Sequence, residues 1–346
     1  MPLGSAVAIA ADRLTRPVEG MHRAISHRWF SALGPVAAPI RLAHDAIADT
    51  VYASIRVAGT AVGIGLDLGV RLEEEAADGL RAFVTGVLGD DHGPHSRALD
   101  IPMEVRGLAD ERTGRLVVLV HGVTETERIF GGADGLAAAI DTDPTLTAIP
   151  IRYHTGLPIA DNGARLADLL EDVVADWPVP VHTIALVGRS MGGLVARAAC
   201  TIATDAGHGW VGAVSDVITI GTPHRGSYVA RFAHAAARGL AIVPETRPLA
   251  DVLDARSPGI GDLRHGYEAE LPAGIDHHFV AGVVTADPDH PVGALVGDAL
   301  VGRRSAVGHG LGPTTTVTVA SAPHGRVHRH PDVVAEVMGW LGRSAG

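Results

Sequence analysis

Lysine is absent from the sequence, so arginine supplies all 28 basic side chains, and 39 acidic side chains outnumber them. The formal net charge at pH 7 is therefore −11. Proteins that bind phosphates use clusters of lysine and arginine to neutralise them. The charge balance disfavours a nucleic-acid partner and strong attraction to an anionic membrane surface.

Cysteine and aromatic residues are also scarce. Cys200 is the only cysteine, which excludes a disulfide within the chain and a CxxC metal or redox motif. We expect it to be a small buried apolar residue rather than a reactive thiol. Aromatic residues make up 4% of the 346 residues, but hydrophobic residues make up 47%. At roughly 100–200 residues per domain, the chain is long enough for one large domain with an accessory segment.

The sequence also lacks a long apolar run. The stretch Val57–Val70 is interrupted by Asp67 and is shorter than the roughly 20 residues that span a membrane. Residues 1–11 have neither the positively charged first segment nor the cleavage site of a secretory signal, which predicts a cytoplasmic protein. Helix-like spacing of apolar residues predicts an N-terminal helical accessory region over residues 1–95. Its role is either internal packing or peripheral membrane contact, and the oligomeric state is left open.

After a polar boundary near residue 95, apolar runs alternate with helical patterns over residues 96–346. Such alternation predicts an α/β domain, with a mostly parallel sheet and helices on both faces. A long irregular stretch at about residues 224–272 interrupts the pattern and predicts a lid-like insertion. The predicted strands are 101–106, 116–120, 147–153, 181–187, 214–220, 279–284 and 315–319. The predicted helices begin at Asp161 as an N-cap, at Leu194, and at Pro331 before residues 333–341.

The motif Gly188-Arg189-Ser190-Met191-Gly192 lies between a predicted buried strand and a predicted helix. A nucleophile at such a junction stands on a sharp, strained turn, and side chains two residues away on either side would collide with it. The two glycines therefore fit a nucleophile elbow around Ser190. The backbone N–H of Met191 would point at an oxyanion.

Three further features of the sequence fall in the order along the chain that a serine hydrolase needs. His121-Gly122-Val123 ends an earlier strand, and the N–H of Val123 would be the second oxyanion donor, with His121 a structural residue. An acid follows the strand at 279–284, and the candidates are Asp287, Asp289 and Asp298. A histidine follows the last strand, and the candidates are His324, His328 and His330. The order serine, acid, histidine is that of α/β hydrolases.

The chain from Arg115 to Leu341 resembles α/β-hydrolase lipases and esterases, particularly the bacterial group similar to GPI inositol-deacylase-like lipases. Arg189 departs from the family pattern, in which histidine more often precedes the nucleophile. The resemblance implies Asp298 as the acid and His324 as the base. It leaves His328 and His330 as solvated surface residues. The segments that carry it are LVHG (119–122), RYHTGLPIADNGARLADLLE (152–171), LVGRSMGGLVAR (186–197), ITIGTPHRGS (218–227), GDALVGRRSA (297–306) and HGRVHRHPDV (324–333).

The sequence therefore predicts a serine hydrolase that cleaves carboxylic esters or lipids through Ser190, His324 and Asp298 and an acyl-enzyme. No metal or organic cofactor is required, and we expect the adjacent His277 and His278 to be structural. Thioester or amide hydrolysis and acyl transfer are the alternative reactions. A non-catalytic binding protein on the same fold is the alternative from another class.

Overall fold

The computed structural model describes residues 74–88, 101–226, 257–263, 265–267 and 271–343, with scattered positions between residues 4 and 64. The chain divides into two compact units, Met1–Asp100 with Arg231–Ser257, and Ile101–Ala230 with Pro258–Gly346. Most of the predicted lid, residues 227–256, lies outside the described residues. The lid and the predicted boundary near residue 95 stay predictions.

The first unit is described mainly through helix α3 (Glu74–Leu88). Ser257 belongs to the same unit, and its hydroxyl donates a hydrogen bond of 2.6 Å to the carbonyl of Gly86. Most of the apolar stretch at residues 57–70 lies outside the described residues. Among the helices that the structure describes, none is both long enough and apolar enough to cross a membrane.

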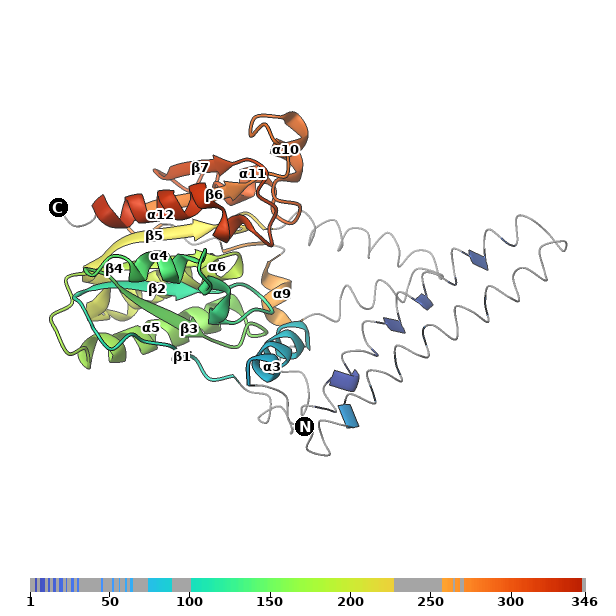
Figure 1. Cartoon of the computed structure of the whole chain (residues 1–346), viewed down its shortest axis with the longest axis horizontal. Coiled ribbons are helices and arrows are strands. Elements are labelled where there is room, and N and C mark those ends of the chain that lie inside the picture. Colours follow the sequence, from blue (N-terminus) through green and yellow to red (C-terminus); the bar gives the residue numbers. More distant parts are fainter. Residues whose placement is uncertain are drawn as a thin grey trace. The chain divides into compact units, whose positions relative to one another are not determined.

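The second unit is built on a seven-stranded sheet with the order β1-β3-β2-β4-β5-β6-β7 (Figure 1). Only the edge strand β1 runs antiparallel to its neighbour, and all other pairs are parallel. The carboxyl ends of six strands therefore meet at one edge. The strands are β1 (Glu104–Val105), β2 (Arg115–Val120), β3 (Thr147–Arg152), β4 (Thr183–Arg189), β5 (Val214–Ile220), β6 (Asp276–Gly282) and β7 (Thr315–Val319).

Helices cover both faces of this sheet, and each layer has its own apolar core. One face packs against α5 (Ile159–Ala175) and α6 (Met191–Ala206), and the other packs against α4 (Leu136–Asp141) and α12 (Pro331–Arg343). Strands buried on both faces read as continuous apolar runs, which is why β2 and β4 were visible in the sequence. The shorter elements are η3 (Glu127–Phe130), η4 (Gly209–Ala213), α9 (Pro258–Asp262), α10 (Pro291–Val296), α11 (Arg303–Ala306) and η6 (Val327–Arg329).

Most predicted elements match the observed ones closely. β5 and β7 have the predicted bounds, whereas the predicted strand at 101–106 is reduced to the two residues of β1. The prediction that Asp161 caps α5 is wrong, because Pro158 is the N-cap and Asp161 lies in the first turn. An acidic side chain in the first turn still interacts favourably with the helix dipole. Cys200 is buried as expected, and burial raises its pKa to about 12.

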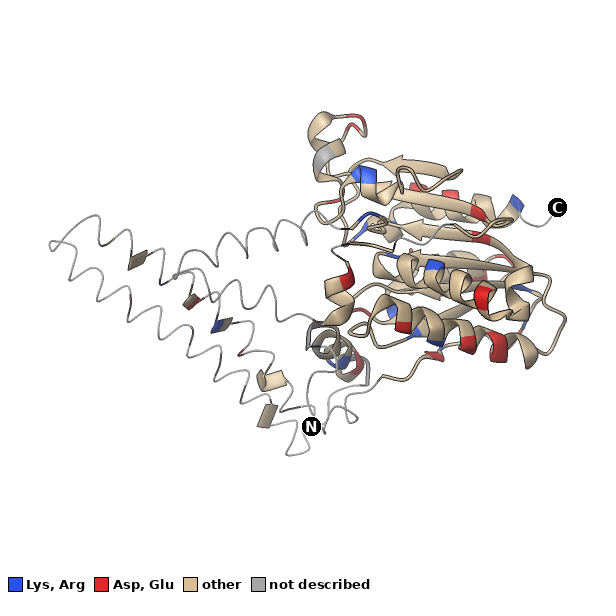
Figure 2. Cartoon of the chain, turned by 180° about the vertical axis from the view of Figure 1, so that it is seen from behind, with Lys and Arg blue, Asp and Glu red and all other residues tan. Residues whose placement is uncertain are grey.

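Acidic and basic positions are mixed along the long helices of the second unit (Figure 2). Helix α5 is the clearest example, because its one basic residue, Arg165, stands among four acidic residues, Asp161, Asp168, Glu171 and Asp172. No long helix of the described part of this unit therefore presents a basic face.

Candidate active site

Ser190 occupies a strained turn between the end of β4 and the start of α6. Its backbone angles are φ 53° and ψ −122°, a region that residues other than glycine rarely adopt. Its N–H donates to the carbonyl of Ile220 on the neighbouring strand over 2.9 Å, which holds the turn against the sheet. The turn therefore presents the Ser190 hydroxyl at the carboxyl edge of the sheet.

The glycines on either side of Ser190 leave no room for a side chain. A Cβ at Gly188 would lie 2.4 Å from Gly193, and a Cβ at Gly192 would lie 2.1 Å from the Val120 carbonyl oxygen. Both distances are far below van der Waals contact. The motif thus follows from the close packing of the turn, as its spacing predicted.

Three side chains far apart in the sequence meet at this edge. His324 Nε2 lies 3.1 Å from Ser190 Oγ, and His324 Nδ1 lies 2.7 Å from Asp298 Oδ2. Because a carboxylate can only accept, the imidazole carries its proton on Nδ1, which leaves Nε2 free to accept from the serine hydroxyl. The geometry matches a nucleophile, a base and a group that orients the base.

Asp298 is fully buried and held from several directions. Its Oδ1 accepts hydrogen bonds from the N–H groups of Leu300 at 3.0 Å and Val301 at 2.8 Å. Its backbone carbonyl accepts from the N–H of His324 at 2.8 Å, which ties the two loops together. These bonds stabilise the ionised carboxylate and fix its orientation.

The other two acidic candidates lie elsewhere. Asp287 is exposed, and its carboxylate accepts a hydrogen bond from the N–H of Asp289 within the same turn. Asp289 is exposed as well and pairs with Arg303 at 3.0 Å. Of the three acids that the sequence offered, only Asp298 contacts His324.

Two backbone N–H groups of the segments around Ser190 form no hydrogen bond within the described part of the chain. In the loop after β2, the N–H of Gly122 donates to Glu125 and the N–H of Thr124 donates to Thr155. The N–H of Val123 between them, like that of Met191 at the start of α6, donates to no acceptor among the described residues. These are the two groups that the sequence predicted for an oxyanion hole.

A largely buried ion pair beside Ser190 was not predicted. Arg189 Nη1 binds Glu125 Oε1, and Arg189 Nη2 donates to the carbonyl of His324 at 2.7 Å. Glu125 Oε2 in turn accepts from the N–H of Gly122 at 3.0 Å. One Arg–Glu pair therefore connects the nucleophile turn, the loop after β2 and the histidine loop. The unusual residue before Ser190 was the only signal in the sequence.

His121 has the structural role expected of it. Its ring stacks on Tyr153 with centroids 4.4 Å apart, and Nδ1 lies 2.9 Å from the carbonyl of Gly122. Burial lowers the pKa of His121 to about 4, so the ring is neutral at pH 7. The tyrosine hydroxyl donates to the His121 carbonyl at 2.6 Å, which braces the start of the loop.

The prediction that His328 and His330 are solvated surface residues is wrong for His328. His330 is partly exposed, with Nδ1 3.8 Å from an Asp332 carboxylate oxygen. His328 is buried in η6, and burial, followed by the charges of Arg189 and Arg329, lowers its pKa to about 4. The burial of His328 could not be predicted from the sequence because the short η6 helix has no helical apolar pattern.

The buried His328 leads to an expected loss of stability in acid. The unfolded chain binds a proton at this side chain near pH 6.5, whereas the folded chain binds it only near pH 4. The free energy of unfolding should therefore fall by up to about 3 kcal/mol as the pH drops from 6.5 to 4. His328→Gln should make this acid slope shallower in urea unfolding followed at several pH values. An unchanged slope would contradict the assignment.

Comparisons with known proteins identify the fold that carries this site. The model of the PGAP1-like alpha/beta domain family matches residues 167–236, which include Ser190 and the strand after it. No curated protein matches the chain in sequence. The propeptide form of a Bacillus licheniformis lipase is 22% identical with a TM-score of 0.51, over 70% of this chain and 52% of that one. The chain has the α/β-hydrolase fold.

Two other solved structures are similar in a looser sense. The mature form of the Bacillus licheniformis lipase is 21% identical with a TM-score of 0.49, over 69% of this chain and 95% of that chain. A Staphylococcus hyicus lipase is 14% identical with a TM-score of 0.42, over 69% of this chain and 98% of that chain. This chain spans about half the length of the propeptide form. The match to the propeptide form confirms the predicted resemblance to α/β hydrolases at the level of the fold.

Proposed function

We propose that this α/β hydrolase is a serine hydrolase that cleaves carboxylic esters. The observation that carries the proposal is the chain of contacts from Asp298 Oδ2 through the imidazole of His324 to Ser190 Oγ, at 2.7 and 3.1 Å. A hydroxyl aligned with an imidazole, which is itself oriented by a buried carboxylate, is activated for attack on a carbonyl carbon. The lipases of similar fold support an ester as the substrate class.

The reaction follows from the position of each proton. His324 Nε2 takes the proton of the Ser190 hydroxyl as the oxygen attacks, and Asp298 stabilises the imidazolium that forms. The N–H groups of Val123 and Met191 donate to the oxyanion of the tetrahedral intermediate. His324 then protonates the leaving alcohol, and an acyl-enzyme remains on Ser190. Water, activated by the same imidazole, releases the acid.

The acyl group is the part of the substrate that the proposal defines least sharply. Segments resembling those of lipases favour an apolar acyl chain. A panel of p-nitrophenyl esters of rising chain length tests the preference for an apolar acyl chain. Matched thioester and anilide substrates test whether the reaction is ester hydrolysis. We expect kcat/KM to be highest for an ester. Higher values for the thioester or the anilide would replace ester hydrolysis by one of those reactions, and no turnover of any substrate would favour a binding protein.

The Arg189–Glu125 pair should position the reacting groups without touching the substrate. Glu125→Gln removes the charge that balances buried Arg189, which typically destabilises a fold by about 3 kcal/mol. We also expect kcat to fall by about tenfold with a smaller change in KM, because the His324 and Gly122 backbones lose a shared anchor. Urea unfolding and steady-state kinetics measure the two effects.

Glu127→Gln is the matched control for Glu125→Gln. Glu127 pairs with Arg152 at 2.7 Å, and both side chains are nearly buried, but neither residue contacts Ser190 or His324. This variant should lose stability and keep kcat. If both variants lower kcat equally, the Arg189–Glu125 pair has only a structural role.

A further inference from the structure

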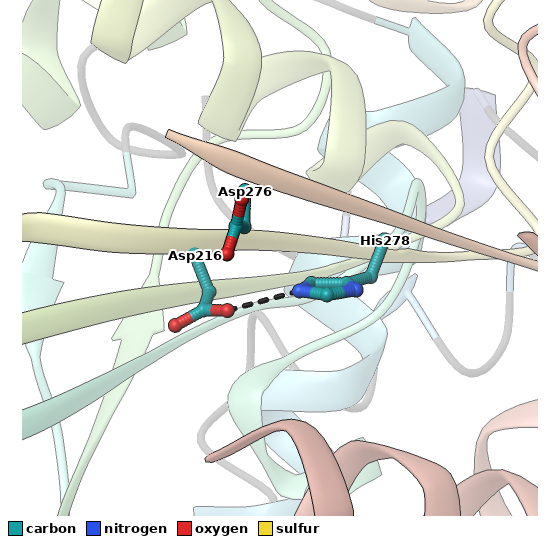
Figure 3. A group of neighbouring side chains, drawn as sticks. All are labelled: Asp216, Asp276 and His278. Atoms are coloured by element: carbon teal, nitrogen blue, oxygen red, sulfur yellow. Dashed lines mark hydrogen bonds and ion pairs between the residues drawn. The ribbon is translucent and has the colours of Figure 1, made fainter. Parts of the chain in front are cut away.

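Three metal-ligating side chains lie together at the amino ends of β5 and β6 (Figure 3). Ser190 lies at the opposite, carboxyl edge of the sheet, directly after β4. Asp216 is the third residue of β5, and Asp276 and His278 are the first and third residues of β6. Residues two apart on a strand share a face, and Asp216 is the direct register partner of Asp276. One ligand atom of each side chain lies within 4.8 Å of the other two.

The charges of this cluster are not balanced by the cluster itself. Two carboxylates on adjacent strands repel each other. His278 Nε2 lies 2.9 Å from Asp216 Oδ1, so the one imidazole engages the buried carboxylate. Asp276 forms no ion pair with any residue in the part of the chain that the structure describes. Figure 3 shows its carboxylate pointing toward the Asp216–His278 pair.

Packing holds two of the three ligands in place. The Asp216 and His278 side chains are 3% and 9% exposed, and the imidazole stacks on Trp340 of α12 with centroids 4.5 Å apart. The Asp276 end is exposed, which gives an ion a path from solvent. Ligands fixed by packing lose little conformational entropy on binding.

We propose that Asp216, Asp276 and His278 bind one Zn²⁺ ion that joins β5 to β6 at the amino edge of the sheet. Mixed imidazole and carboxylate ligands suit Zn²⁺, whereas Ca²⁺ and Mg²⁺ take oxygen ligands. Bonds of about 2.0–2.2 Å place the ligand atoms of a tetrahedral Zn²⁺ about 3.4 Å apart. The Asp216–His278 pair, at 2.9 Å, is close to that spacing, and the Asp276 ligand atom lies within 4.8 Å of both partners. Water fills the fourth position.

The ion would act on the fold and not on the ester. The cluster lies at the edge remote from Ser190, so the inference is independent of the proposed hydrolysis. The sequence predicted no metal site and gave His278 a structural role, because its partner Asp216 lies 62 positions earlier. Only the parallel pairing of β5 with β6 brings the two together.

Zinc binding by the metal-stripped full chain tests the proposal. After dialysis against ZnCl₂, metal analysis and titration calorimetry should find one tight equivalent per chain, and Zn²⁺ should raise the thermal unfolding midpoint. Asp276→Asn changes an exposed side chain, so the variant should fold. It should bind this equivalent at least tenfold more weakly and lose the shift in midpoint. His278→Gln, which keeps a hydrogen-bonding group toward Asp216, should do the same.

The control must account for the 19 histidines of the chain, any of which can bind zinc weakly. Asp168 lies 3.7 Å from His208, and among the described residues these two are not part of a group of three ligating side chains, so Asp168→Asn should leave the tight equivalent unchanged. The proposal is overturned if the wild type binds no tight equivalent, or if Asp276→Asn binds zinc as tightly as the wild type.

Discussion

Ser190→Ala should reduce ester hydrolysis by about 10⁴- to 10⁶-fold in kcat/KM. The variant lacks the hydroxyl oxygen that lies 3.1 Å from His324 Nε2, while the proposed oxyanion donors remain. Removing a small hydroxyl from a strained turn should leave the fold intact. Initial rates on p-nitrophenyl esters, with circular dichroism to verify folding, measure the effect.

Ser215→Ala is the matched control for this result. Ser215 is a half-buried serine on the neighbouring strand β5, where its hydroxyl makes one long contact of 3.4 Å to the Ile184 carbonyl. This variant should hydrolyse esters at the wild-type rate. Equal rates for Ser190→Ala and the wild type would mean that Ser190 is not the nucleophile.

Asp298→Asn should lower kcat by about 10⁴-fold at pH 7. An amide that donates a hydrogen bond toward His324 Nδ1 stabilises the tautomer with its proton on Nε2, which cannot accept the serine proton. Steady-state kinetics on the same esters measure the loss. Because Asp298 also accepts from the N–H groups of Leu300 and Val301, the thermal unfolding midpoint should be recorded alongside.

Asp287→Asn tests one of the two other acids that the sequence offered beside Asp298. Asp287 follows the same strand, but its carboxylate is exposed and contacts its own turn. We expect the kcat of the Asp287→Asn variant to stay within about twofold of the wild-type value. Full activity in Asp298→Asn, or a large loss in Asp287→Asn, would reverse the assignment.

The nucleophile turn was predictable because its constraints are local. A buried strand, two glycines around Ser190 and a following helix lie within one short segment, and each reflects a collision that a side chain would cause. The strands β2 and β4 were predictable for a similar reason, since burial on both faces leaves continuous apolar runs. Asp298 and His324 were selected through family resemblance, because local sequence offered three candidates for each role.

The remaining features depend on contacts between distant segments. Arg189 and Glu125 are 64 positions apart, and no local pattern pairs them. The burial of His328 depends on the packing of η6 beside Arg189 and Arg329. Periodicity can indicate which face of an element is buried, but it cannot identify the polar side chains that face each other across the sheet.

Covalent labelling by a fluorophosphonate tests most directly whether Ser190 is an activated nucleophile. The reagent bonds to a serine oxygen whose proton a nearby base removes, so intact mass should increase by one adduct per chain. Peptide mass spectrometry should place that adduct on Ser190, and Ser190→Ala should remain unlabelled. A folded wild-type chain that takes up no adduct, or an adduct on another residue, would contradict the account.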